Sequence, residues 1–285
     1  MGKNKSIVRQ VTERINSMTA YGDSKHEDKH KNGGKPDPDK IYSFSTRKAY
    51  LDAAIHFARW AKETHGCRDL NDARAYTREY LDQRTRAGLS AWTVRLDAAA
   101  LAKVYGCQTT ELGAALPSRR RQDVTQHRTD AWVGHFSPER HPDLVALARS
   151  TGLRRHELAA LRPEDVERRP DGTVWVTVRQ GKGGKQREVE ALDDTALRLA
   201  QEAQEAGREL VIDHIPKYAP IHEYRALYAK AIYALYERPL EGLDRSQIYA
   251  AKGDLEGCKW DREAMLYASR MLGHNRLDVM TAYLD

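Results

Sequence analysis

The stretch GTVWVTVRQGKGGKQREVEAL, residues 172–192, decides the fold class of this chain because its apolar period is two. Val174, Val176 and Val178 are spaced two apart, and the same spacing resumes through Val189 after the glycine-rich turn GKGG. A period of two is typical of a β-strand with one buried face, and a turn of this composition joins two such strands. The stretch therefore predicts a β-hairpin in a chain whose other patterns are helical.

Helical patterns flank the hairpin on both sides. Residues 42–117 contain three segments with apolar residues at helical spacing, and each segment ends at a glycine. The first takes Ser45 as its N-cap and Gly66 as its stop. Helical patterns also cover PDLVALARSTGLRRHELAALRPEDV before the hairpin, and DTALRLAQEAQEAGREL and PIHEYRALYAKAIYALYE after it. The sequence thus predicts a mainly α fold with a small β-sheet.

Composition divides the chain into four parts. Residues 1–41 are predicted to be a flexible N-terminal segment, because most of it is charged and almost free of large apolar residues. Only SIVRQVTERINSM within it has the pattern of a short amphipathic helix. Residues 42–117 are predicted to be an all-helical domain, and the polar, basic residues 118–130 a linker. Residues 131–285, which include the hairpin, form the second predicted domain.

Charge and composition limit the function without identifying it. The chain has 285 residues, of which 40% are hydrophobic and 31% charged, and a net charge of +6. It can therefore bury a core, and its charge permits a polyanionic partner. The three cysteines have no paired spacing, which argues against a disulfide framework and predicts a reduced, cytoplasmic location. We find neither a signal-peptide pattern nor a membrane-spanning stretch, so no membrane association is expected.

Four short motifs in the second domain contain residue types suited to catalysis. Each motif alone has an ordinary structural explanation, because arginines on helices and lysines in turns are usually solvated, and tyrosines usually pack. The histidine and arginine of HEYR share a helix face that either solvent or a polyanion could cover. An apolar stripe of Tyr224, Leu227, Tyr228, Ala231 and Leu235 is expected on the other side of that helix. The four motifs supply Arg154 (TGLRRHEL), Lys182 (GKGGK), His222 and Arg225 (HEYR), and His274 and Tyr283 (LGHNRLDVMTAYLD).

Together these residue types fit attack on a phosphodiester by a tyrosine hydroxyl. Arginine forks match the geometry of the non-bridging phosphate oxygens and can stabilise charge that develops on them. A lysine can protonate the leaving alkoxide, and histidines can accept the nucleophile's proton or hydrogen-bond the phosphate. The tyrosine then forms a covalent intermediate. Neither a carboxylate cluster suited to a metal pair nor a GxxxxGK[ST] loop is evident, so no metal, ATP or other cofactor is expected.

The order of these motifs resembles the tyrosine recombinases, the phage-integrase and Xer-like family. TGLRRHELAAL is similar to the family's first-arginine motif, GKGGKQREV to its catalytic hairpin, HEYR to its His-x-x-Arg box, and LGHNRLDVMTAYL to its closing motif. The resemblance covers about residues 131–285. It implies an α+β catalytic domain there, with Tyr283 as nucleophile and the other five residues as catalytic groups. By position and helicity, residues 42–117 resemble the family's core-type, SAM-like DNA-binding domain.

The resemblance also implies a function and partners. The family cuts and rejoins duplex DNA through a 3′-phosphotyrosine intermediate, and four protomers exchange strands on DNA. We therefore expect a site-specific recombinase of a mobile element, monomeric in solution and tetrameric on DNA, and associated with the nucleoid when bound. An accessory DNA-bending or excision factor is a further expected partner. The residues expected to contact DNA are Arg47, Lys48, Arg86, Arg95, Lys185 and Arg187.

Two features depart from the family pattern. Arg225 and His274 are 49 positions apart, about twice the usual spacing in the family, and the extra segment is approximately 238–262. Only Leu284 and Asp285 follow Tyr283, where family members usually continue into a helix that docks on a neighbour. Two other functions stay open: a type IB topoisomerase-like enzyme with the same chemistry, and a catalytically inactive DNA-binding regulator.

Overall fold

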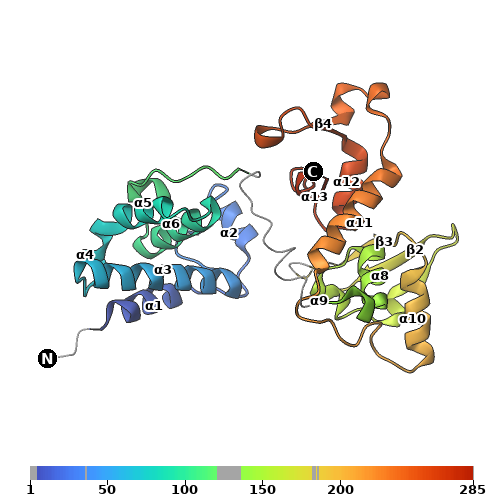
Figure 1. Ribbon diagram of the computed structural model, residues 1–285, viewed down its shortest axis with the longest axis horizontal. Helices are drawn as coiled ribbons and strands as arrows, with labels where there is room; N and C mark the ends of the chain where they lie inside the picture. The colour runs from blue at the N-terminus through green and yellow to red at the C-terminus, as the bar shows by residue number, and fades with distance from the viewer. Residues whose placement is uncertain (1–4, 36, 121–135, 182–183, 185, 285) are drawn as a thin grey trace. The chain divides into compact units, whose positions relative to one another are not determined.

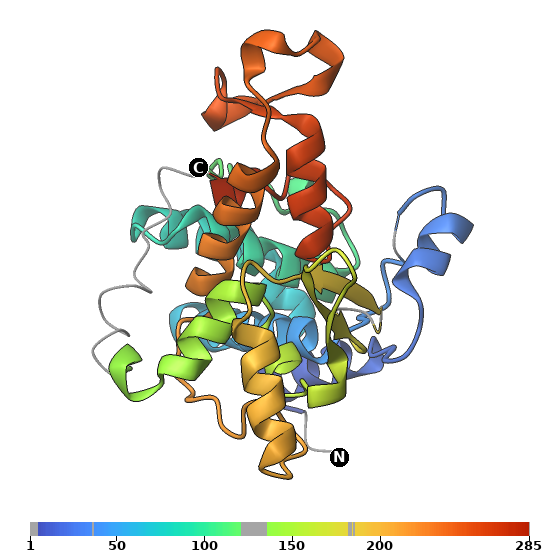
Figure 2. The ribbon, with the colours of Figure 1, turned by 90° about the vertical axis from the view of Figure 1, so that its right-hand side faces the viewer.

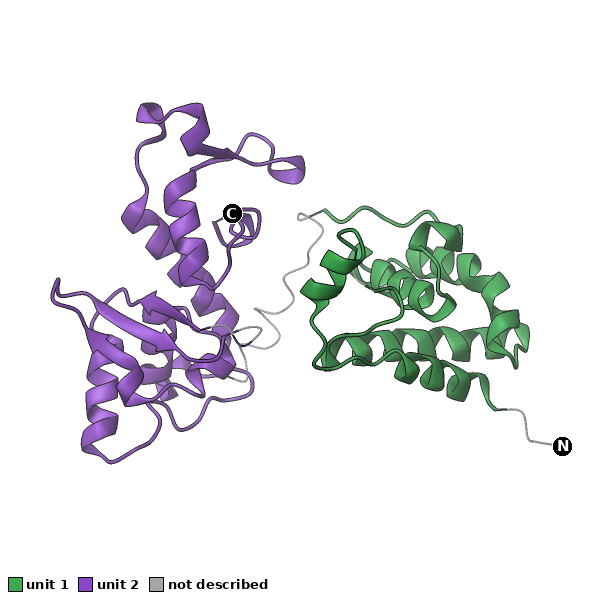
Figure 3. Cartoon of the chain, turned by 180° about the vertical axis from the view of Figure 1, so that it is seen from behind, with its two compact units in different colours: residues 1–124 green, residues 125–285 purple. Residues whose placement is uncertain are grey.

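The computed structural model describes residues 5–35, 37–120, 136–181, 184 and 186–284. The chain divides into two compact units, residues 1–124 and 125–285 (Figure 3). Lys182, Lys185 and most of the predicted linker lie outside the described residues. None of the described helices is long and apolar enough to cross a membrane.

The regular secondary structure in the described residues of unit 1 is helical, apart from one isolated β-bridge between Thr19 and Ile41. The long helix α3 packs against α1 on one side and against α6 on another, and the core between them includes Phe57 and Leu101. The side chain of Ser43 caps α3, two residues before the predicted cap, and Gly66 ends the helix with a φ of 69° as predicted. The helices are α1 (Ile7–Ser17), α2 (Lys25–Lys31), α3 (Phe44–His65), α4 (Leu70–Ala73), α5 (Thr77–Arg86) and α6 (Ala91–Tyr105) (Figure 1).

The N-terminal residues belong to unit 1, which corrects the prediction of a separate flexible segment over residues 1–41. Ile7, Val11 and Ile15 lie on one face of α1 and are buried in the core of the unit. Further along, Lys40 forms ion pairs with Asp23 at 2.8 Å and with Asp28 at 3.0 Å. The composition of this segment was misleading, because ion pairs rather than buried apolar side chains hold residues 23–40 together.

Unit 2 contains both sheets and the remaining helices. In the larger sheet, β1, β2 and β3 are antiparallel neighbours in that order, and Val176 lies opposite Val189, which confirms the predicted hairpin. Strand β1 begins at Val166, the last residue of a stretch predicted to be helical, and its three residues are too few to show a period. The elements are α8 (Pro142–Thr151), α9 (Arg155–Leu158), β1 (Val166–Arg168), β2 (Val174–Val178), β3 (Arg187–Glu190), α10 (Thr195–Glu205), α11 (Ile221–Tyr236), β4 (Ile248–Ala250), β5 (Lys259–Asp261), α12 (Arg262–Met271) and α13 (Thr281–Leu284) (Figure 1).

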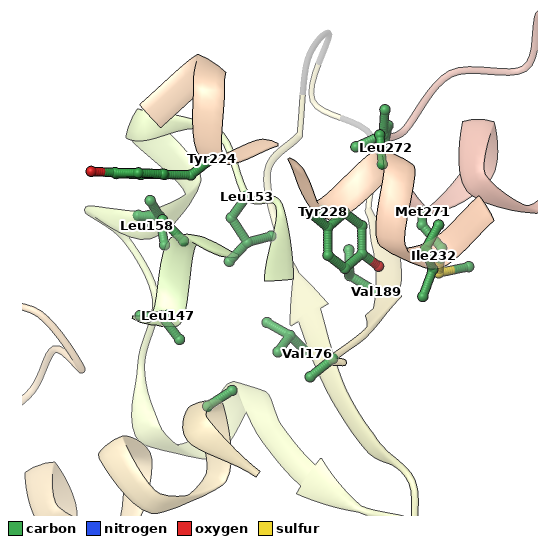
Figure 4. Close-up of a cluster of buried hydrophobic side chains, with 14 of the residues drawn as sticks. Leu147, Leu153, Leu158, Val176, Val189, Tyr224, Tyr228, Ile232, Met271 and Leu272 are labelled. Atoms are coloured by element: carbon green, nitrogen blue, oxygen red, sulfur yellow. The ribbon is translucent and has the colours of Figure 1, made fainter. Parts of the chain in front are cut away.

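Helix α11 runs through the core of unit 2, and its buried face overlaps the predicted one only in part, at Tyr224 and Tyr228. Tyr224, Tyr228 and Ile232 pack with residues of α8, α9, β2 and β3 in the apolar cluster shown in Figure 4. Leu227 and Leu235 of the expected apolar stripe are instead 42% and 63% exposed. The buried face is rotated by about one residue and includes Arg225.

The extra segment 238–262 forms a lobe of unit 2. Figure 2 shows it projecting beyond the adjoining ends of α11 and α12, and within it β4 pairs with β5. At its base, Arg238 Nε and Nη2 donate to the buried Asp261 carboxylate at 2.7 and 2.8 Å. Tyr249 and Trp260 face each other across the two strands and pack against the core of unit 2.

Candidate active site

Gly152 gives the TGLR motif its sharp bend. Helix α8 ends at this glycine, which has a φ of 59°, and the chain then turns so that Arg154 becomes the N-cap of α9. A Cβ at position 152 would lie 2.3 Å from Cδ1 of Tyr228, so only glycine lets α11 approach this closely. The bend therefore positions Arg154 beside the His-x-x-Arg helix.

Glu157 is a buried carboxylate that fixes Arg154. Its oxygens accept hydrogen bonds from the backbone N and from Nη1 of Arg154, both at 2.8 Å. They also accept from Nη1 and Nη2 of Arg187 at 2.7 and 2.8 Å. Burial alone would raise the pKa of Glu157, but the hydrogen bonds and charges of Arg187 and Arg154 outweigh it and lower the pKa to about 2. The carboxylate is therefore ionised at neutral pH.

Arg225 and Arg154 converge on one peptide group. Arg225 is 1% exposed and donates to the carbonyl oxygens of Gly152 and Leu272. Arg154 Nη2 donates to the same Leu272 oxygen at 3.0 Å. Burial and then the positive charge of Arg154 lower the pKa of Arg225 to about 10, with Tyr283 opposing them. Arg225 therefore carries positive charge at neutral pH, and Arg154 lies within a short distance of it.

Tyr283 on α13 completes the cluster. Its side chain lies near Arg225, and it raises the pKa of that guanidinium against the effect of burial. The Tyr283 ring centroid lies 5.8 Å from that of His222 and 6.4 Å from that of His274. The structure thus brings together Arg154, His222, Arg225, His274 and Tyr283. The sixth predicted residue, Lys182, lies outside the described residues.

The predicted DNA contacts differ in how accessible they are. Lys48 and Arg86 are exposed on unit 1, whereas Arg47 bonds to Asn16 and Arg95 donates to the carbonyl oxygen of Pro117 at 2.6 Å. Lys185 lies outside the described residues.

Arg187 requires a correction. It was expected to contact DNA, but its side chain is 12% exposed and points inward to Glu157. The buried Glu157 carboxylate accepts two hydrogen bonds from this guanidinium.

Two contributors to the site have no assigned role in the sequence patterns. Glu157 follows Arg154 by three positions, and that spacing was the one available signal. Arg155 donates to four backbone oxygens in the loop that leads into α11: those of Ile215, Pro216, Lys217 and Ala219, at 2.7–3.5 Å. Any residue has a backbone carbonyl, so the sequence of the loop that Arg155 contacts shows no pattern. Arg155 could therefore not have been identified from the sequence as a contributor to the site. Within the described ranges, no group of three or more His, Cys, Asp or Glu side chains could hold a metal ion.

Comparisons with known proteins give the fold. No family model matches the sequence, and no curated protein matches it. One similar solved structure is the XerH site-specific recombinase bound to palindromic difH substrate, in a post-cleavage complex. It superposes with a TM-score of 0.54 at 14% sequence identity, and the match covers 97% of this chain and 90% of that chain. The XerH pre-cleavage complex with difH substrate gives 0.52 at 14% identity, covering 98% and 92%. The Tn1549 transposon integrase with circular intermediate DNA gives 0.46 at 12% identity, covering 99% and 95%.

Proposed function

We propose that this chain, which has the tyrosine-recombinase fold, is a site-specific DNA recombinase with Tyr283 as its nucleophile. The observation that carries the proposal is the cluster around Tyr283. Its side chain lies near Arg225, two histidine rings flank it, and Arg225 shares the Leu272 carbonyl with Arg154. These groups come from α9, α11, α13 and the loop after α12, so the fold assembles them from distant parts of the sequence.

The two arginines suit a phosphodiester. Each guanidinium presents several N–H donors in a plane, and two of them can bracket the non-bridging oxygens of one phosphate. Negative charge grows on those oxygens as the tyrosine attacks, and donors already in place stabilise it without reorganisation. The burial of Arg225 strengthens this effect, because charges interact more strongly away from water.

The reaction then follows as a balanced exchange of bonds. The Tyr283 oxygen forms a bond to phosphorus while the bond from phosphorus to the 5′ oxygen breaks. A histidine of the pair His222 and His274 accepts the tyrosine proton, and Lys182 donates a proton to the leaving 5′ oxygen. The 3′-phosphotyrosine keeps the energy of the phosphodiester, so the 5′ hydroxyl of another strand can attack it and reseal the DNA.

The same chemistry would serve a topoisomerase, and the fold comparison favours recombination instead. XerH, which shares the fold over both units, is a site-specific recombinase bound to its difH substrate. The resemblance of the motifs, rather than this comparison, supports duplex DNA as the substrate, four protomers on DNA as the active assembly, and a mobile element as the setting. A catalytically inactive regulator would have no need for the cluster of Arg154, His222, Arg225 and His274 around Tyr283.

In this proposal unit 1 is the core-type DNA-binding domain and unit 2 the catalytic domain. Unit 1 includes α1, because Ile7, Val11 and Ile15 of that helix are buried in its core. Lys48 and Arg86, which are exposed, are the proposed phosphate contacts of unit 1. An affinity that falls on the order of 10³–10⁵-fold between 50 and 200 mM salt would correspond to about 6–10 phosphate contacts.

A covalent-adduct assay tests the proposal. Nicked duplexes tiled across the DNA that flanks the gene are incubated with the protein and resolved on a denaturing gel. Wild type should give a protein–DNA adduct, and Tyr283→Phe should give none, because it lacks only the attacking oxygen. Tyr249→Phe removes the same oxygen from a half-buried tyrosine of unit 2, so it is the matched control and should react normally. An adduct of equal yield from Tyr283→Phe would refute the assignment.

A second assay separates recombinase from topoisomerase. A supercoiled plasmid that carries two copies of the cleaved site is incubated with wild type. Recombination gives products with exchanged segments, whereas a topoisomerase gives only relaxed plasmid. Relaxation without exchanged products at a site that forms the adduct would favour the topoisomerase.

A further inference from the structure

Arg187 lies where the hairpin meets the active site. It is the first residue of β3 and pairs with Val178 at the end of β2, next to the turn that contains Lys182. Its neighbour Glu188 is exposed, but the Arg187 side chain turns toward the interior and is 12% exposed. A charged group turned inward at this position must interact with specific partners.

Those partners are on two other segments of unit 2. Nη1 and Nη2 of Arg187 donate to the two Glu157 oxygens, and Glu157 in turn binds the backbone and side chain of Arg154. Nε of Arg187 donates to the Met271 carbonyl oxygen at 3.2 Å. A Cβ at Gly273 would lie 3.0 Å from Nε, so the Arg187 side chain packs directly on this glycine. One guanidinium therefore contacts both segments that hold Arg154.

The second of these segments also holds Arg225. Leu272 lies between Met271 and Gly273, and its carbonyl oxygen accepts from both Arg154 and Arg225. Arg187 thus restrains the backbone on either side of the peptide that orients the arginine pair. Through Glu157 it also restrains Arg154 from the opposite side.

We propose that Arg187 is a positioning residue that sets the geometry of Arg154 and Arg225, and that it does so through Glu157 and the Met271–Gly273 backbone. It contacts neither DNA nor the reacting atoms. Its three bonds run in two directions, to Glu157 and to Met271. A lysine ammonium cannot reproduce that planar fork, so Arg187→Lys should fail as Arg187→Met does. The catalytic consequence rests on the proposed function, but the positioning itself does not.

Hydrogen exchange tests the positioning without any DNA. The Arg154 amide bonds to a Glu157 oxygen, and the His274 amide bonds to the Ser269 carbonyl oxygen. In Arg187→Lys and Arg187→Met, both amides should exchange faster than in wild type. Arg169→Met is the matched control. Arg169 pairs with Glu188, which lies on β3 beside Arg187, and not with Glu157. Unchanged exchange at both amides in the two folded Arg187 variants would overturn the proposal, even if the protein never cleaved DNA.

Cleavage then separates positioning from direct contact with DNA. Small displacements of catalytic groups reduce rates strongly, so both Arg187 variants should form the Tyr283 adduct roughly 10- to 100-fold more slowly than wild type. Their affinity for duplex DNA should stay within about twofold of wild type, since no phosphate contact is lost. An affinity loss as large as the rate loss would overturn the proposal in favour of a DNA contact, as would full recovery in Arg187→Lys.

A chemically altered substrate excludes a role through Lys182 alone. Sulfur in place of the bridging 5′ oxygen makes a leaving group that needs no proton. If Arg187 acts through the arginine pair, its variants should stay slow on this substrate. Recovery to the wild-type rate would show that Arg187 serves only the hairpin lysine, and would overturn the proposal. Absence of an adduct from wild type on every substrate would instead count against the proposed function.

Discussion

Replacing Glu157 with glutamine should destabilise unit 2 by an amount that can be worked out from its surroundings. The carboxylate is buried and accepts four hydrogen bonds, two each from Arg154 and Arg187. Its pKa of about 2 in the folded protein, against an ordinary 4.5, corresponds to about 3 kcal/mol at neutral pH. Removing one partner of a buried ion pair generally costs about 3–5 kcal/mol, so two independent arguments agree.

The pH dependence gives the prediction a second observable. Because the folded pKa of Glu157 is lower than the unfolded one, its stabilisation is present above 4.5 and is lost as the pH falls toward about 2. The difference between wild type and Glu157→Gln should therefore shrink to about 1.4 kcal/mol at pH 3. Asp261 has a pKa lowered to a similar value by Arg238. Its contribution is the same in both proteins and cancels in the difference.

Equilibrium urea unfolding with pulse proteolysis measures this difference and scores unit 2 separately from unit 1. Glu164→Gln is the control, because Glu164 pairs with Arg179 on the surface with 57% of its side chain exposed, and should change little. If Glu157→Gln destabilised unit 2 by less than about 1 kcal/mol at neutral pH, the Glu157 ion pairs would be no stronger than surface pairs, and the predicted contribution would be refuted. A destabilisation equal at neutral and acid pH would refute it as well.

Three further variants test separate parts of the site. Arg225→Lys keeps the positive charge but loses the planar fork of N–H donors, so the rate of adduct formation in single-turnover assays should fall on the order of 10²–10³-fold. A wild-type rate would show that Arg225 does not bind the phosphate. Lys182→Ala should fail on ordinary DNA and recover on the bridging-sulfur substrate, and failure on both would assign the acid elsewhere. Gly152→Ala puts a methyl 2.3 Å from the Tyr228 ring at a φ of 59°, so urea unfolding should show a loss of about 2–5 kcal/mol; a loss below about 1 kcal/mol would contradict the close approach.

The features predicted correctly from the sequence are those with a local cause. The period of two through Val174, Val176 and Val178 specifies the hairpin, because alternation depends only on neighbouring residues. Glycine at position 66 ends a helix for an equally local reason, a positive φ. The convergence of the motif residues in unit 2 was predicted by resemblance rather than by spacing, and their catalytic roles remain a proposal.

The features that were missed depend on tertiary contacts. The buried face of α11 was predicted from apolar residues, but the fold buries Arg225 with them and leaves Leu227 and Leu235 exposed. Arg187 looked like a surface residue until its partner Glu157 was located 30 positions away in the sequence. The N-terminal helix shows the same limit, since Ile7, Val11 and Ile15 are few among many charges and become a core only against α3.

The electrostatics of the arginine pair argue for an anionic ligand independently of any resemblance. Arg225 is buried beside the charge of Arg154, and both effects lower its pKa. Within their described contacts, the two guanidinium groups share a neutral acceptor, the Leu272 carbonyl, and Glu157 is bound by Arg154 and Arg187 together. Two like charges held in one partly dry site raise the energy of the folded chain, and an anion between them would lower it. A phosphate beside Tyr283 meets that requirement, because its charged oxygens attract both guanidinium groups more strongly than a carbonyl oxygen does.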